Sequence, residues 1–167
     1  MVSAGSSPTR SVPATGTARW LAQPGTVFYG VALLGFAIQA VTGFGGRLFL
    51  GGNAGWLLFI HMLGAPLFII GLTGFAVIWA ERCQFGGGGP YAARRLPLVQ
   101  RVLFWAVLVF GLATVLTMLA AMLPTFGYAA LDALREAHKY TALLLVITVG
   151  AHAIVSLAAK WARRKTG

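Results

Sequence analysis

The chain has 167 residues, of which 58% are hydrophobic and 10% are charged, and its mean hydropathy is +0.81. A soluble domain carries about 25% charged residues, so thirteen Lys and Arg with three Asp and Glu cannot cover a water-soluble surface of this size. The same apolar content excludes a disordered chain, and the single cysteine excludes a disulfide framework or a CxxC metal motif. We therefore expect one domain embedded in a membrane.

The formal net charge of +10 does not by itself indicate nucleic-acid binding. The basic residues stand at the ends of apolar runs rather than on one polar face. Basic residues in such places are typical topology signals of membrane proteins.

Residues 1–25 are rich in Ser, Thr, Pro, Gly and Ala and are expected to form a flexible cytoplasmic tail. No apolar stretch begins before about Thr26, which argues against a cleaved signal peptide.

Four apolar runs follow, at about 26–44, 56–80, 99–123 and 138–159. Each is about as long as the roughly 20 residues that cross a bilayer as a helix, whereas a membrane barrel would show short alternating segments. Residues 26–160 are therefore predicted to form an all-α, integral membrane four-helix bundle, and 161–167 a basic cytoplasmic tail. The connections are short, the middle one contains the glycine run 86–89, and residues 131–137 could extend the fourth helix above the membrane.

The distribution of basic residues predicts the orientation, because four spans place both termini on one side. That side holds most of the basic residues, namely Arg10, Arg19, Arg82, Arg94, Arg95, Arg101, Lys160, Arg163, Arg164 and Lys165. The other side holds only Arg47, Arg135 and Lys139. The positive-inside rule then makes both termini cytoplasmic.

The strongest candidates for chemistry are three histidines, because a histidine inside a lipid-embedded helix is costly and usually functional. His138 and His152 lie on the fourth predicted helix, fourteen residues apart. Fourteen steps of 100° return to within about 40° of the starting direction, and the rise separates the two by about 21 Å. This spacing predicts one site near the outer surface and one deeper, toward the cytoplasm.

His61 lies on the second predicted helix, at a depth similar to that of His138, so the two can face each other across the bundle. A haem iron held between two imidazoles needs this arrangement. Two small residues one turn after His61, Gly64 and Ala65, are expected to let a porphyrin lie flat against the helix. Three basic residues on the same outer side, Arg47, Arg135 and Lys139, could pair with haem propionates.

Two alternatives remain for these histidines. Each could merely bond to neighbouring hydroxyls or carbonyls. A zinc or copper site is weaker, because only two histidines are level and no carboxylate or thiol sits in the membrane beside them.

At this point the chain resembles the four-helix membrane cytochrome b family that includes formate dehydrogenase gamma subunits and nickel–iron hydrogenase cytochrome b subunits. The resemblance covers about residues 26–164 and depends on His61-Met-Leu-Gly64, on His138-x13-His152 and on the step Thr42-Gly43-Phe44. It implies an outer haem b on His61 and His138, a place in the bacterial inner membrane, and electron transfer between the quinone pool and a partner redox subunit.

The chain departs from the family at the inner haem, which the resemblance places between His152 and a histidine on the first helix. That helix has no histidine and offers Phe28 and Tyr29 at this depth. Three readings stay open for His152. It could be the sole protein ligand of a five-coordinate second haem, or bind a haem that is ligated differently, since tyrosine such as Tyr29 is an occasional haem ligand. It could be a polar group in a quinone pocket, or it could be a relic held by a hydrogen bond, for example to Tyr29.

The remaining polar and sulfur-containing residues carry weaker signals. Cys83 is expected to be an inert thiol, Met118 and Met122 to be packing residues, and Gln39 to bond between helices. Asp132 and Glu136 are expected at a solvated helix end.

The sequence thus predicts a non-catalytic electron-transfer subunit of a larger redox complex, with haem b at His61 and His138. A quinone is a second candidate ligand. The alternative is a haem-free structural or anchor subunit whose helices pack through Gly and Ala.

Overall fold

The computed structural model describes residues 24–49, 51, 55–85 and 96–165. These residues form four long helices, α2 (Pro24–Phe49), α3 (Gly55–Trp79), α4 (Leu98–Ala121) and α5 (Tyr128–Lys165), and the short 3-10 helix η1 (Ala80–Cys83). The described part of the chain contains no strand. The all-helical prediction is confirmed for this part of the chain, and all four helices are long and apolar enough to cross a membrane.

The observed helices differ from their predicted ranges mainly in the first and the last helix, α2 and α5. Helix α2 already begins at Pro24 and continues to Phe49, and α5 begins at Tyr128 rather than near His138. Residues 161–165, which we assigned to a basic tail, continue α5. Residues 1–23 of the predicted N-terminal tail and the glycine run 86–89 lie outside the described residues.

Apolar segments of this length are expected to be helical, because a helix satisfies its backbone hydrogen bonds within one segment and can therefore enter lipid. Large apolar side chains remain exposed along the helices, among them Val41 at 71%, Val77 at 73% and Ile154 at 69%. Exposed apolar surface of this extent is expected where lipid, rather than water, surrounds the helices. The four helices therefore fit a multi-pass membrane protein in contact with a bilayer.

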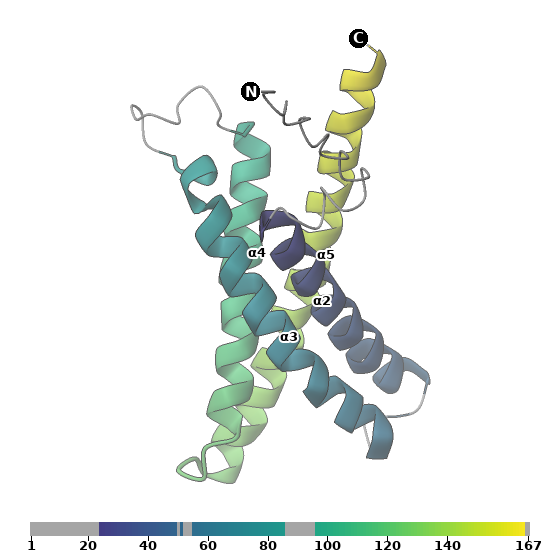
Figure 1. Cartoon of the computed structure of the whole chain (residues 1–167). Coiled ribbons are helices and arrows are strands. Elements are labelled where there is room, and N and C mark those ends of the chain that lie inside the picture. The colour runs from purple at the N-terminus through teal and green to yellow at the C-terminus, as the bar shows by residue number, and fades with distance from the viewer. Residues whose placement is uncertain (1–23, 50, 52–54, 86–95, 166–167) are drawn as a thin grey trace, which may run out of the picture.

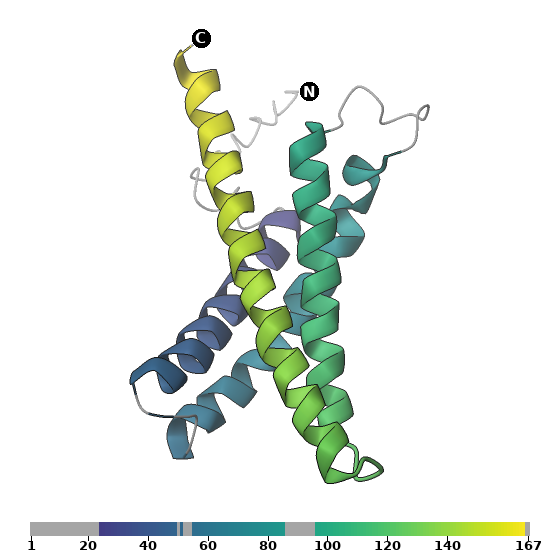
Figure 2. The same cartoon turned by 180° about the vertical axis from the view of Figure 1, so that it is seen from behind.

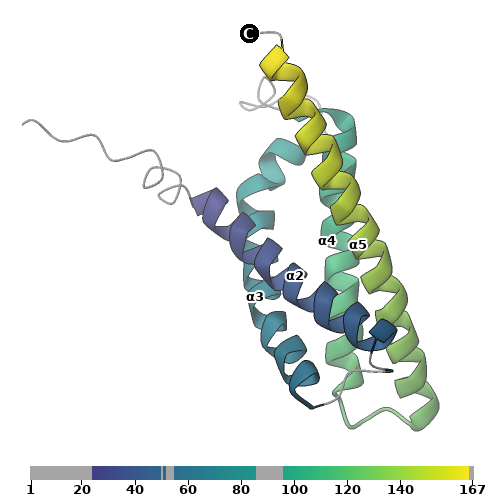
Figure 3. The same ribbon diagram turned by 90° about the vertical axis from the view of Figure 1, so that its right-hand side faces the viewer.

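Helices α2 and α3 form a hairpin whose backbones approach closely at glycines. A Cβ atom added to Gly35 would collide with the Phe68 backbone, and one added to Gly71 would collide with the Ala32 backbone. One added to Gly64 would lie 2.7 Å from Ile38 Cγ2. Small residues at helix contacts let apolar helices pack through van der Waals forces, and these glycines fix the α2–α3 pairing (Figure 3).

Helices α4 and α5 form the second hairpin and lie side by side along most of α4 (Figure 2). The two hairpins touch each other much less than the helices within each hairpin do. Their contact is a cluster of the buried side chains Phe68, Val107 and Leu145. Beside it, Gly111 leaves room for Leu72 of α3, since a Cβ there would lie 2.7 Å from Leu72 Cδ2.

The ends of the helices alternate between two ends of the molecule, as four consecutive spans require. The end of α2, the start of α3 and the α4–α5 turn lie at one end, and η1, the start of α4 and the end of α5 lie at the other (Figure 1). We call the first the outer end and the second the inner end, after the predicted orientation. The hairpins diverge toward the outer end (Figure 1).

At the inner end, polar contacts connect η1 to the start of α4. Trp105 Nε1 donates a 2.8 Å hydrogen bond to the Cys83 carbonyl, and Arg101 donates a 2.9 Å hydrogen bond to the Gln84 carbonyl. The Cys83 side chain is fully buried beside Phe75 and Phe104. This packing joins the two hairpins at the inner end.

Candidate functional site

A cavity with a volume of about 710 Å³ lies between the two hairpins. All four long helices line it. Ligand sites are usually clefts of roughly 300–1,000 Å³ with mostly apolar walls and a few polar groups, and this cavity fits that description. Its polar and charged lining residues are Gln39, Arg47, His61, Thr114, Arg135, Glu136, His138, Lys139 and Tyr140.

His61 reaches this cavity from α3 and is held by its own hairpin partner, α2. Its Nδ1 lies 2.8 Å from the hydroxyl of Thr42, which is buried. That hydroxyl also lies 2.6 Å from the Ile38 carbonyl one turn earlier in α2 and donates its single proton there. With the proton placed there, the hydroxyl oxygen can accept from the ring, and this arrangement favours the tautomer with the proton on Nδ1 and a free lone pair on Nε2.

His138 reaches the same cavity from α5 and is held by its own hairpin partner, α4. Its Nδ1 lies 3.0 Å from the Thr114 carbonyl and 3.5 Å from the Thr117 hydroxyl. A carbonyl oxygen only accepts, so Nδ1 again carries the proton and Nε2 again keeps its lone pair. Both histidines do bond to neighbours, as one alternative expected, but those bonds use only one nitrogen of each ring.

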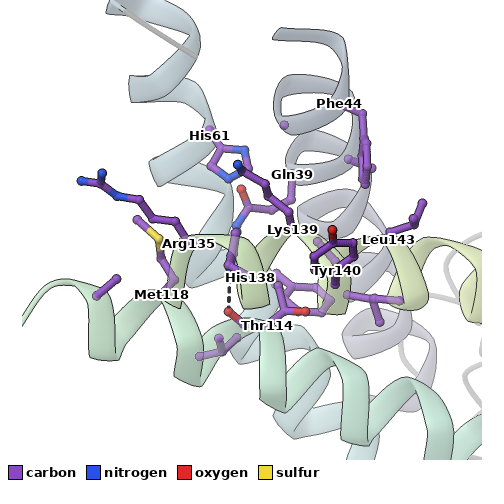
Figure 4. A pocket seen from close by; sticks show the side chains of 18 of the residues that line it. Gln39, Phe44, His61, Thr114, Met118, Arg135, His138, Lys139, Tyr140 and Leu143 are labelled. Carbon is purple, nitrogen blue, oxygen red and sulfur yellow. Dashed lines mark hydrogen bonds between the residues drawn. The ribbon is translucent and has the colours of Figure 1, made fainter. Parts of the chain in front are cut away.

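The two rings therefore form two matched halves of one site. Each hairpin supplies one imidazole and holds its Nδ1, and the two rings turn toward a shared space with Gln39 beside them (Figure 4). Within the described residues no group of three or more His, Cys, Asp or Glu could hold a metal ion, so the donor set here is a pair of imidazoles.

The predicted basic residues Arg47, Arg135 and Lys139 all line the same cavity, where α2 and α5 approach the outer end. Lys139 forms an ion pair with Glu136 one turn earlier, so part of its charge is already neutralised within α5. Arg47 lies near enough to Glu136 to interact with it electrostatically. The rim of the cavity is therefore a mixed cluster with a net positive charge.

Gly64 does not lie where the sequence suggested. It is buried against Ile38 and Gln39 of α2 and does not line the cavity. The space left by its missing side chain serves the α2–α3 contact, and Ala65 is the neighbouring residue that does face the cavity.

The structure adds two residues whose roles the sequence did not assign, Thr42 and Gly43. Gly43 makes room for the His61 ring, because a Cβ there would lie 3.1 Å from His61 Cε1. The conspicuous Thr42-Gly43 step was the signal that could have identified both, but only the packing of α2 on α3 shows which side chain they serve.

His152 does not join the outer site. With Tyr29 it lines a second cavity of about 130 Å³, whose other walls are mostly aromatic and aliphatic. His152 Nδ1 is buried and has no hydrogen-bond partner among the described residues. The structure therefore brings His152 and Tyr29 to one cavity without showing a bond from Nδ1 to Tyr29.

A comparison with protein-family models, with curated proteins and with solved structures finds no match to this chain.

Proposed function

We propose that this protein is a membrane-embedded b-type cytochrome that holds one haem b between His61 and His138. In this role it carries electrons between the membrane quinone pool and a partner redox subunit, and it is a non-catalytic part of a larger complex. The likeness to the formate dehydrogenase gamma and hydrogenase cytochrome b family suggests the same role.

One observation carries the proposal. Two imidazoles, one from each hairpin, line one cavity of about 710 Å³, and each has its Nδ1 bound to its own hairpin. Haem iron in a bis-imidazole site takes the lone pairs of two such nitrogens from opposite sides. A metal-binding histidine almost always donates its other ring nitrogen to a protein acceptor, as both rings do here.

The rest of the cavity supports the same group. Its apolar walls, including Phe36, Leu58 and Leu145, suit a flat hydrophobic macrocycle. The positive rim formed by Arg47, Arg135 and Lys139 suits the two carboxylates that such a macrocycle carries. When bound, the haem supplies one-electron chemistry; the chain supplies the ligands, excludes water and sets the local charge.

The proposed location is the bacterial inner membrane, with both termini in the cytoplasm. The inner end carries basic positions of η1, α4 and α5, among them Arg82, Arg101 and Arg164, whereas the basic residues of the outer end gather at the cavity. An excess of Lys and Arg on one side is typical of the cytoplasmic face.

The test is the absorption spectrum and the haem content of the purified protein. We expect a reduced b-type spectrum and one haem per polypeptide in a pyridine haemochrome assay. His61→Ala should abolish both, because it removes one of two axial ligands. Thr148→Val is a matched control, since the Thr148 hydroxyl bonds to the Leu144 carbonyl in its own helix.

A colourless wild-type protein that remains folded would contradict the proposal. That result would favour the haem-free anchor subunit, whose helices pack through the glycine contacts of α2 and α3.

A further inference from the structure

The geometry points to Thr42 as a positioning residue for His61. We infer that its hydroxyl fixes the protonation of the His61 ring and thereby both presents Nε2 to the cavity and lowers the reduction potential of the bound group. The part of this inference that concerns the potential depends on the proposed haem. The part that concerns the ring does not, because it can be read in the protein alone.

The first part of the argument concerns the acceptor to which the Thr42 hydroxyl donates its proton. The hydroxyl has one proton, and the shortest of its three contacts, 2.6 Å to the Ile38 carbonyl, takes that proton, while the Gln39 carbonyl lies farther away at 3.5 Å. Toward His61 Nδ1, 2.8 Å away, the oxygen is left with lone pairs. Since Thr42 is buried, water competes little for this bond, and the neutral ring is held in the tautomer with Nδ1–H.

The second part of the argument concerns the packing that limits the orientation of the His61 ring. His61 Cε1 faces Gly43, where an added Cβ would lie 3.1 Å away, so the ring fits closely against the α2 backbone. Rotation of the ring about its bond to Cβ would exchange Nδ1 for a carbon and would lose the bond to Thr42. Thr42 and Gly43 together therefore select one orientation of the His61 ring.

The two histidines differ in whether a substitution can remove the group that accepts the hydrogen bond from Nδ1. His138 donates to a main-chain carbonyl, that of Thr114, which no substitution removes. His61 donates to a side-chain hydroxyl, which a single substitution removes. Thr42 is thus a position at which a side-chain substitution can tune the closer of the two hydroxyl contacts, 2.8 Å for Thr42 with His61 against 3.5 Å for Thr117 with His138.

The direction of the tuning follows from the hydrogen bond. An acceptor on Nδ1–H makes the imidazole a more basic ligand, which favours the oxidised iron over the reduced iron. Loss of the acceptor should therefore raise the reduction potential. Thr42→Val removes the acceptor at almost constant shape, and Thr42→Ser retains it.

The first measurement uses protein without haem, labelled with ¹⁵N-histidine, because protonated and unprotonated ring nitrogens resonate in separate regions. The His61 signals are assigned by their loss in His61→Ala. We expect the Nδ1–H tautomer in the wild type and in Thr42→Ser, and an added population of the Nε2–H tautomer in Thr42→Val. A His61 ring that carries its proton on Nε2 in the wild type overturns the inference, whether or not the protein binds haem.

The second measurement uses the full chain with haem. We expect Thr42→Val to keep one haem per polypeptide, to shift the low-spin ferric EPR signal and to raise the midpoint potential. Thr42→Ser should restore both toward the wild type, and Thr148→Val should leave both unchanged. If Thr42→Val does not fold, Thr42→Ala and Thr42→Ser give the same contrast.

The outcomes separate this inference from the proposed function. A wild type without haem but with Nδ1–H on His61 contradicts the proposed function and leaves the role of Thr42 in orienting the ring. A haem protein whose EPR signal and potential are the same with Thr, Val and Ser at position 42 contradicts the positioning role and leaves the proposed function.

Discussion

The cavity lined by His61 and His138, here called the outer cavity, and the cavity lined by His152, here called the inner cavity, surround their histidines in different ways. In the outer cavity, His61 and His138 each have Nδ1 bound to the neighbouring helix of the same hairpin. In the inner cavity, His152 Nδ1 is buried without a hydrogen-bond partner in the described ranges, and the space is about 130 Å³ rather than about 710 Å³. The two cavities therefore differ in whether a neighbouring helix holds one nitrogen of the histidine ring.

The two cavities are also neighbours, because Phe36 and Phe68 line both. These rings belong to the α2–α3 hairpin and separate the outer space from the inner one. Four pairs of variants test the difference between the two cavities.

The largest difference should appear between His138→Ala and His152→Ala, which lie on the same helix. His138→Ala should remove the haem completely, because one axial nitrogen is lost, whereas His152→Ala should keep one haem per polypeptide. The measurement is the pyridine haemochrome assay on both purified variants. Equal haem loss in the two would contradict the distinction between the cavities.

The next largest effect should come from Phe68→Ala, which removes the wall between the cavities. Phe68 is only 5% exposed and lies in the cluster that joins the hairpins, so the substitution should lower the free energy of unfolding by about 3–5 kcal/mol. Thermal or denaturant unfolding in detergent measures this. Phe59→Ala on α3 is the control, because Phe59 is 51% exposed and should cost much less.

A smaller effect, of opposite sign in the two cavities, should follow from replacing histidine with leucine in the protein without haem. His152→Leu should raise the free energy of unfolding by about 1 kcal/mol, because it removes a buried polar atom that finds no partner within the described residues. His61→Leu should lower it by a similar amount, because the bond to Thr42 is lost. Unfolding in detergent measures both, and a stabilising His61→Leu would show that its hydrogen bond is not structural.

The smallest effect should come from the charged rim of the outer cavity. Arg135→Gln removes an exposed positive charge beside the proposed haem, and a positive charge favours the reduced state. The midpoint potential should therefore fall, by less than about 1 kcal/mol or about 40 mV, since solvent screens exposed charges. Redox titration measures this, and Arg164→Gln, at the opposite end of α5, should leave the potential unchanged.

The fold was predictable from the sequence to a large extent, because composition and run length alone require four helices in this chain. The depth of His61 and of His138 was also predictable, since it depends only on the rise per residue. The start of α5 at Tyr128 was predicted only in part, because residues 128–137 are more polar than the rest of the helix and contain no apolar run.

The faces of the helices were not predictable, and Gly64 illustrates the reason. Helix α3 is apolar all round, so no polar stripe indicates which side packs against α2. We predicted that Gly64 lies beside a porphyrin, because it is one turn after His61. In the structure, its missing side chain leaves room for Ile38 of α2 instead. In the same way, no pattern in the sequence connects Thr42 to His61 or Thr114 to His138.

The sequence by itself determined that the chain is helical, apolar enough to span a membrane four times, and equipped with two imidazoles at similar depth. Only the tertiary structure decided that these imidazoles share one cavity and that each is held by the other helix of its hairpin. The physical reason is that backbone hydrogen bonding and hydrophobicity are properties of single segments, whereas hydrogen bonds between side chains on different helices depend on how those helices are rotated and paired.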